Sequence, residues 1–209
     1  MNIQKLIQGH KKFKDNIYKN YKQDFEALIE NGQKPKVLFI GCSDSRVSPD
    51  LIFHSRPGDM FTTRNIGNFV PPYKVNDDFH GTTAVIEYAV NILKVEDIIV
   101  CGHSHCGACK ALFDDNIKQD KNLSHVAKWL ELGYEAKEIA KNICQGDKSK
   151  LAKTVEQESI KIQLKNILTY PMINRLVKTN KINIHGWYYD IPNGTISNYD
   201  KNKNIFKEI

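Results

Sequence analysis

Two short and almost entirely apolar runs, Val37–Ile40 and Asp97–Cys101, constrain the fold more than any other feature of the sequence. Each run continues into a glycine, Gly41 or Gly102. Runs this short and this apolar are typical of parallel strands that are covered on both faces. We therefore expect both segments to lie in the interior of a parallel sheet.

Further strand and helix patterns alternate along the chain. Met60–Arg64 and Lys181–Tyr189 also have strand character, and helical periodicity marks Thr82–Leu93, about Leu123–Cys144, and Thr154–Leu168. This alternation predicts an α/β fold with a mainly parallel central sheet flanked by helices. The Asn-Gly pair in "YYDIPNGTISNY" predicts a hairpin after the last of these strands. We expect about four parallel strands plus an antiparallel edge strand.

The N-terminal segment is predicted to be a helical arm. Apolar residues recur at helical spacing from residue 2 to about residue 31, namely Phe13, Ile17, Tyr21, Phe25 and Leu28. Asn31-Gly32 ends this pattern, and Pro35 follows it. No repeat or linker divides the remaining chain. We therefore expect a single domain over residues 1–209, with an N-terminal helical arm over about residues 1–31.

Composition argues against several classes of partner. The formal net charge is +6, and the lysines are mixed with acidic residues and lack a stacking motif, so we predict no nucleic-acid partner. No segment approaches the roughly 18 consecutive apolar residues of a membrane span, and no signal-peptide core is present. Five cysteines, three of them within nine residues, favour metal binding or redox chemistry in a reducing compartment. We expect a cytoplasmic protein without a membrane partner.

Three chemically active side chains follow the first apolar run at alternate positions. In an extended chain, Cys42, Asp44 and Arg46 of "VLFIGCSDSRV" project from the same face. Open α/β sheets form their ligand sites beyond the carboxyl ends of parallel strands. A thiol, a carboxylate and a guanidinium at this position therefore predict a functional site.

The second apolar run ends in a second group of potential ligands. In "DIIVCGHSHCGACKAL", His103 and Cys106 have the spacing of metal ligands at a strand-to-helix turn. Together with Cys42 they form a set of two cysteines and one histidine, which suits a tetrahedral zinc ion with its fourth position open to water. We predict one Zn²⁺ ion per chain.

Two other interpretations of these cysteines stay open. Cys106-Gly-Ala-Cys109 is a C-x-x-C motif that also suits a redox dithiol, and Cys109 as a fourth ligand would give a closed structural zinc site. Neither explains a carboxylate and a guanidinium beside Cys42. A catalytic zinc does, because an ionised Asp44 can accept a hydrogen bond from a zinc-bound hydroxide while Arg46 keeps that carboxylate ionised.

The two motifs together resemble those of the β-class carbonic anhydrases. "CSDSRV" is followed by "CGHSHCGA", and the flanking segments also resemble family segments in family order: "GQKPKVLFIGCSDSRV", "FTTRNIGNFVPPY", "GTTAVIEYAV", "LKNILTYPMI" and "HGWYYD". The resemblance implies that Cys42, His103 and Cys106 bind zinc, and that Asp44 and Arg46 form the catalytic dyad.

The activity implied by this resemblance is the zinc-dependent, reversible hydration of carbon dioxide to bicarbonate and a proton. One alternative is a hydrolase of carbonyl sulfide or carbon disulfide on the same scaffold. A non-catalytic structural-zinc protein and a redox protein are the others.

The resemblance also implies a substrate pocket and a partner subunit. Five residues match the family's pocket: Gln33, Phe61, Ile66, Tyr88 and, through its backbone amide, Gly107. The family's glutamine at the position of Gln33 reaches across a dimer interface. We therefore expect a homo-oligomer, at least a dimer, in which the N-terminal helices pack on a partner subunit.

A subset of the family binds bicarbonate at a second site through a tryptophan, an arginine and a tyrosine. Arg64 and Tyr189 match two of these residues, but Phe39 occupies the tryptophan position and "VPPY" is plant-like. We predict that this chain belongs to the plant-like subset without that regulation. His105, between two predicted ligands, is expected to face solvent.

Overall fold

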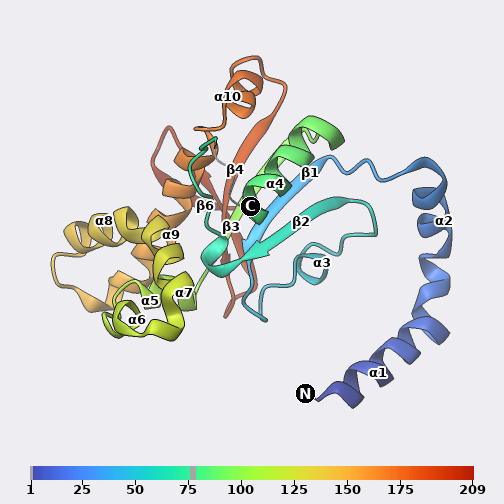
Figure 1. Cartoon of the computed structure of the whole chain (residues 1–209), viewed down its shortest axis with the longest axis horizontal. Helices are drawn as coiled ribbons and strands as arrows, with labels where there is room; N and C mark the ends of the chain where they lie inside the picture. Colours follow the sequence, from blue (N-terminus) through green and yellow to red (C-terminus); the bar gives the residue numbers. More distant parts are fainter. Residues whose placement is uncertain (1, 76–78) are drawn as a thin grey trace.

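A six-stranded sheet forms the centre of the protein, which is described here by a computed structural model covering residues 2–75 and 79–209 (Figure 1). The strand order is β2-β1-β3-β4-β5-β6. The strands are β1 (Val37–Cys42), β2 (Met60–Asn65), β3 (Asp97–His103), β4 (Asn183–Asp190), β5 (Thr195–Asp200) and β6 (Ile205–Glu208).

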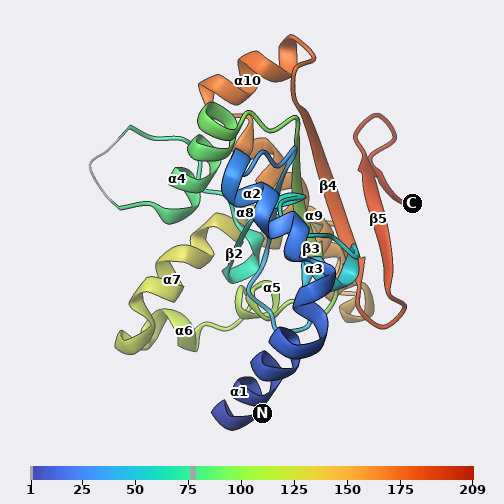
Figure 2. The same ribbon diagram turned by 90° about the vertical axis from the view of Figure 1, so that its right-hand side faces the viewer.

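The first four strands run parallel to their neighbours, as the sequence predicted. Their ends differ from the predicted ones by at most two residues, and β1 and β3 run on to Cys42 and His103. The predicted hairpin forms at Asn193-Gly194, and Figure 2 shows its strands β4 and β5 side by side. We expected one antiparallel edge strand, but the sheet has two. The second is β6, Ile205–Glu208, which pairs antiparallel with β5. This strand has only four residues, too few to give a clear alternating pattern.

Helices flank the sheet and confirm the α/β prediction. They are α3 (Pro49–Ile52), α4 (Gly81–Glu87), α5 (Gly107–Ala111), α6 (Asn116–Gln119), α7 (Ser124–Leu130), α8 (Tyr134–Cys144), α9 (Lys148–Ile167) and α10 (Pro171–Lys178). Helix α9 starts earlier than predicted, because the Asp147 side chain caps it by accepting a hydrogen bond from the Ser149 amide. None of the helices in the described ranges combines the length and apolar character needed to cross a bilayer.

The central strands are buried on both faces, as their apolar sequences predicted. Leu38 and Ile40 on β1 belong to a core cluster that also contains Ile86 of α4 and Ile173 of α10. The intervening Phe39 belongs to a different cluster and packs edge-on against Phe53, with the ring centroids 5.7 Å apart. This two-sided burial places β1 in the interior of the sheet, and its parallel pairing with β2 and β3 puts their carboxyl ends at the same edge.

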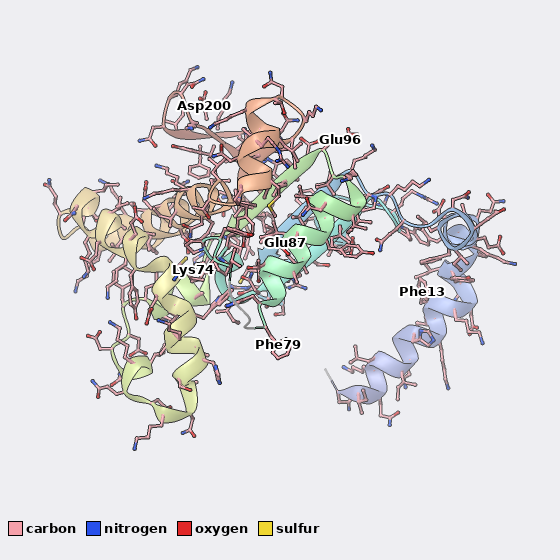
Figure 3. The ribbon with its side chains drawn as sticks, turned by 45° about the horizontal axis from the view of Figure 1, so that its top comes forward. Phe13, Lys74, Phe79, Glu87, Glu96 and Asp200 are labelled. Atoms are coloured by element: carbon pink, nitrogen blue, oxygen red, sulfur yellow. The ribbon has the colours of Figure 1, made fainter. Side chains whose placement is uncertain are left out.

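The N-terminal arm lies apart from the sheet and its helices. It contains α1 (Ile3–Lys12) and α2 (Lys22–Asn31), neither of which has a buried residue, and Figure 3 shows Phe13 well away from the sheet. Arg56 connects the arm to the body, because its Nε donates to Asp24 Oδ2 at 2.9 Å and its guanidinium lies over the Tyr21 ring. An amphipathic segment with its apolar residues exposed is suited to contact with another surface.

Candidate metal centre and active site

Three potential metal ligands meet at the carboxyl ends of β1 and β3. Cys42 closes β1, His103 closes β3, and Cys106 follows three residues later. Their ligand atoms lie within 4.8 Å of one another, and all three residues are buried. They form the one such group of three or more histidine, cysteine or acidic residues in the described part of the chain. Because β1 and β3 are adjacent parallel strands, the fold brings the two sequence motifs together.

The imidazole of His103 has the arrangement expected of a metal ligand. Its Nδ1 lies 2.9 Å from the carbonyl oxygen of Ser104, which assigns the ring proton to Nδ1. Its Nε2 is buried and has no hydrogen-bond partner among the described residues. A buried polar atom without a partner is costly. A cation between Nε2 and the two sulfurs would satisfy it.

The thiols of Cys42 and Cys106 also favour a cation. A hydrogen bond with the Cys106 thiol, followed by burial, raises the pKa of Cys42 to about 12. A hydrogen bond with the Cys109 thiol raises the pKa of Cys106 to about 12, and burial adds to this effect. Two thiolates cannot be held this close together and out of water unless a positive charge compensates them. One nitrogen and two sulfur donors suit Zn²⁺.

Asp44 and Arg46 form a bidentate ion pair next to this group. Arg46 Nη2 donates to Asp44 Oδ2 at 2.7 Å, and Arg46 Nε donates to Oδ1 at 2.9 Å. The Arg46 hydrogen bond holds the pKa of the Asp44 carboxyl well below its usual range. The same Nη2 also donates to the carbonyl oxygen of His105 at 2.9 Å, which joins the two motifs. The carboxylate is therefore ionised and held by the guanidinium.

Comparison with known proteins agrees with this geometry. The family model of carbonic anhydrase matches residues 37–196. A carbonic anhydrase from Synechocystis is 41% identical over 199 residues, which cover 95% of this chain and 71% of the relative. This chain belongs to the β-class carbonic anhydrase family. Hydration of carbon dioxide is the reaction of carbonic anhydrases, and the chain is an enzyme of this type.

Solved structures of β-carbonic anhydrases have the same fold. The β-carbonic anhydrase CcaA superimposes with a TM-score of 0.91 at 39% identity, covering 99% of this chain and 92% of that one. A tetrameric β-carbonic anhydrase from Sordaria macrospora superimposes with a TM-score of 0.70 at 31% identity, covering 93% and 92% of the two chains.

The five predicted pocket residues of this carbonic anhydrase fall into two groups. Ile66 follows the carboxyl end of β2, and Gly107 begins α5, so both lie at the metal end of the sheet. Gln33 precedes β1 at the opposite end. Phe61 lies four residues before the end of β2, a distance of about 13 Å along a strand. Tyr88 lies beside Phe61 and falls in the same group, because the two aromatic rings stack with their centroids 5.7 Å apart. A single chain therefore does not gather all five residues at its own metal end.

A buried glutamate supports the Cys106 loop and was not predicted. The backbone amide of Cys106 donates to Glu156 Oε1 at 3.1 Å, and the Tyr188 hydroxyl donates to Oε2 at 2.9 Å. Glu156 is 5% exposed, and burial raises the pKa of its carboxyl. The sequence offered one signal for this role: Glu156 lies four residues before Ile160 and therefore on the same, buried side of α9.

Arg64 supports the Cys42 loop, and this role was also not predicted. Its Nε donates to the carbonyl oxygen of Cys42 at 2.8 Å, and its Nη2 donates to that of Asp44 at 2.6 Å. The Arg64 guanidinium is thus held by hydrogen bonds to backbone carbonyl oxygens of the Cys42 loop. Phe39, at the tryptophan position of the second bicarbonate site, packs against Phe53. Tyr189 packs on the same cluster. The absence of bicarbonate regulation stays a prediction that these contacts favour.

Arg64→Ala is expected to weaken zinc binding by about 10- to 100-fold, the range typical for residues that orient metal ligands. The two backbone hydrogen bonds that shape the Cys42 loop would be lost. Chelator competition measures the zinc affinity. The control is Arg175→Ala, which changes an exposed arginine on α10 and should bind zinc as the wild type does. An unchanged zinc affinity in Arg64→Ala would show that the loop keeps its shape without this arginine.

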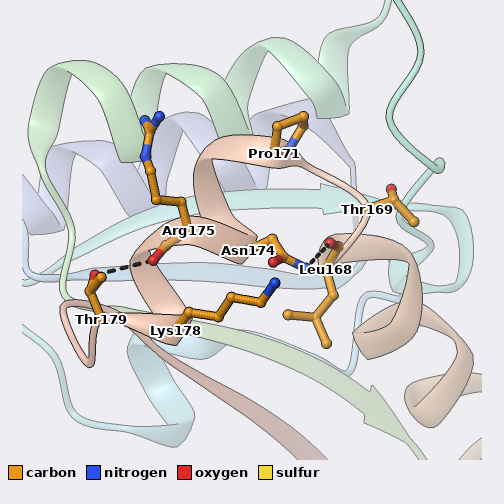
Figure 4. A pocket seen from close by; sticks show the side chains of 7 residues that line it. All are labelled: Leu168, Thr169, Pro171, Asn174, Arg175, Lys178 and Thr179. Carbon is orange, nitrogen blue, oxygen red and sulfur yellow. Dashed lines mark hydrogen bonds between the residues drawn. The ribbon is translucent and has the colours of Figure 1, made fainter.

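A hollow of about 550 Å³ on α10 lies outside the metal centre (Figure 4). It is lined by Leu168, Thr169, Pro171, Asn174, Arg175, Lys178 and Thr179. These side chains include no cysteine, histidine or carboxylate, so this hollow offers none of the usual zinc ligands.

Proposed function

We propose that this carbonic anhydrase catalyses the reversible hydration of carbon dioxide with one Zn²⁺ ion held by Cys42, His103 and Cys106. The bidentate Asp44–Arg46 pair beside the buried ligand group carries this proposal. A closed structural zinc would have no use for this pair. When bound, zinc supplies a Lewis acid that makes water a nucleophile near neutral pH.

Asp44 is proposed to orient the attacking oxygen. Its carboxylate is ionised, and an ionised carboxylate is a strong acceptor for an O–H donor. By accepting that hydrogen bond, Asp44 would turn a lone pair of the attacking oxygen toward the carbon of carbon dioxide. Arg46 would keep the carboxylate ionised and in place through its two hydrogen bonds. The Gly107 amide would donate to the negative charge that develops on the substrate oxygen.

The substrate pocket is proposed to be completed by a second subunit. Ile66 and Gly107 would come from one chain, and Gln33, Phe61 and Tyr88 would come from its partner. Two observations support this division: the two groups lie toward opposite ends of the sheet, and Ile66 and Tyr88 are each 46% exposed in the single chain. Apolar walls with two amide donors, one from the Gly107 backbone and one from the Gln33 side chain, suit a small, apolar substrate such as carbon dioxide.

A homo-oligomer, at least a dimer, follows from the same proposal. The arm over about residues 1–31 would pack on the partner of a single-domain chain, because Ile3 and Leu6 are 66% and 53% exposed. The Sordaria relative is described as tetrameric, which supports assembly without fixing the number of subunits here. We also propose a cytoplasmic location, supported by five free cysteines that a reducing compartment would preserve.

A stopped-flow carbon dioxide hydration assay on zinc-analysed protein tests the proposed function. We expect rapid turnover that rises between about pH 7 and about pH 8.5, because the nucleophile is a deprotonated water. Silence at both pH values with one zinc per chain would overturn the proposal and favour a structural zinc. Turnover of carbonyl sulfide without turnover of carbon dioxide would instead assign the alternative substrate.

A further inference from the structure

The thiol of Cys109 lies beside the proposed metal centre, but the proposed reaction does not use it. Cys106 precedes the first residue of α5, and Cys109 lies on its first turn. Cys109 lies close enough to the Cys106 thiol to raise its pKa. Both cysteines are free, and they are only 4% and 3% exposed. Cysteines in a C-x-x-C motif at the start of a helix are spaced closely enough to form a disulfide.

A pocket between α5 and α9 gives small molecules a route to this pair. The pocket has a volume of about 470 Å³, and Cys106 and Cys109 both line it. Phe113 and Leu151 contribute apolar wall, whereas Lys110 is an exposed cation. Cys42, the other ligand thiol, is not among the lining residues. A small oxidant in this pocket therefore meets Cys106 and Cys109 together.

We propose that Cys106 and Cys109 form a peroxide-sensitive modification site whose oxidation to a disulfide releases the metal. The release rests on the proposed function, since it requires Cys106 to be a zinc ligand. A sulfur bound in a disulfide has lost its thiolate and no longer serves as a strong ligand for zinc. With Cys106 withdrawn, only Cys42 and His103 would remain.

The chemistry balances with hydrogen peroxide as the only added reactant. One sulfur attacks the peroxide, the O–O bond breaks, and a sulfenic acid forms with loss of one water. The second sulfur then attacks the sulfenic sulfur, and the S–O bond breaks to release a second water. Overall, the zinc-bound Cys106 thiolate, the Cys109 thiol, one peroxide and one proton from solvent give one disulfide and two waters, and the zinc is released. The sulfurs lose two electrons, and the peroxide oxygens gain them.

The other cysteines are placed less well for this reaction. Cys101 is 1% exposed within β3, and it does not line the pocket. Cys144 ends α8, and its thiol lies 3.4 Å from Thr154 Oγ1. It is neither in the Cys42–His103–Cys106 group nor among the residues that line the pocket, and it is similarly buried at 8% exposure, so it provides a matched control for Cys109.

Peroxide titration of the zinc-loaded protein tests this inference. Zinc is first quantified in the untreated protein, and its release is then followed with a chromogenic chelator while peptide mass spectrometry locates disulfides. The wild type should release zinc as a Cys106–Cys109 disulfide forms, and dithiothreitol with added zinc should restore the starting state. Cys109→Ser and Cys109→Ala should release zinc severalfold more slowly, whereas Cys144→Ser should follow the wild type.

The outcomes separate this inference from the proposed function. Protein without zinc before peroxide is added would contradict the proposed metal centre itself. Zinc-loaded protein whose Cys109 variants release zinc at the wild-type rate would overturn the inference alone. A disulfide between Cys42 and Cys106, or irreversible oxidation of Cys106 without a link to Cys109, would also overturn it.

Discussion

Asp44→Asn is expected to lower carbon dioxide hydration by about 10²- to 10⁴-fold, the range typical for loss of a positioned acid–base group, while zinc remains bound. The neutral amide cannot supply the negatively charged acceptor that orients the attacking oxygen. It also places an amide donor where Asp44 now accepts from Arg46. The ligand atoms of Cys42, His103 and Cys106 are left untouched by the substitution. Stopped-flow hydration and zinc analysis on the same preparation measure the two effects.

Asp50→Asn is the matched control for this prediction. Asp50 is also a carboxylate with a side-chain partner, since it accepts from Ser55 Oγ at 2.8 Å, but it lies on α3 and is not part of the Cys42–His103–Cys106 group. It should therefore retain wild-type hydration. Wild-type activity in Asp44→Asn would remove Asp44 from the mechanism. Simultaneous loss of zinc and activity would show that Asp44 mainly maintains the ligand loop.

The sequence was sufficient to predict that Cys42, His103 and Cys106 come together, because local patterns determine where they lie. The apolar run before Gly41 is buried on both faces, and the run before Gly102 is its parallel neighbour, so Cys42 and His103 had to meet at one end of the sheet. The Asp44–Arg46 pair was also predictable, since residues two apart in an extended segment share a face.

Contacts made across the fold could not be predicted in this way. Arg64 reaches the backbone of residues about 20 positions earlier, and Glu156 reaches the amide of Cys106 from a different helix. Such hydrogen bonds depend on how strands and helices are juxtaposed, and a single sequence gives no periodic signal for them. The strand β6 was missed for a related reason, because four residues carry too little pattern.

His103→Ala is expected to lower zinc affinity by more than about 100-fold, beyond the range of residues that only orient a ligand, and to abolish hydration with it. The Ser104 carbonyl fixes the His103 ring so that Nε2 faces the two sulfurs without another partner. Because zinc binds the folded protein, adding zinc should raise the Tm of the wild type and leave that of His103→Ala nearly unchanged. Thermal unfolding with and without zinc, together with chelator competition, measures both effects.

His185→Ala is the matched histidine control, since His185 Nε2 pairs with Asp97 Oδ1 at 2.8 Å at the start of β3, away from the metal end. This variant should lose some stability and still show the full zinc-dependent rise in Tm. If His103→Ala instead kept one zinc per chain, another donor must complete the ligand set, and Cys109, which lines the same pocket as Cys106, is the candidate. In the wild type, three sulfurs and the His103 nitrogen would then fill all four positions of a tetrahedral zinc, and the argument for an open catalytic zinc would fail at its first step.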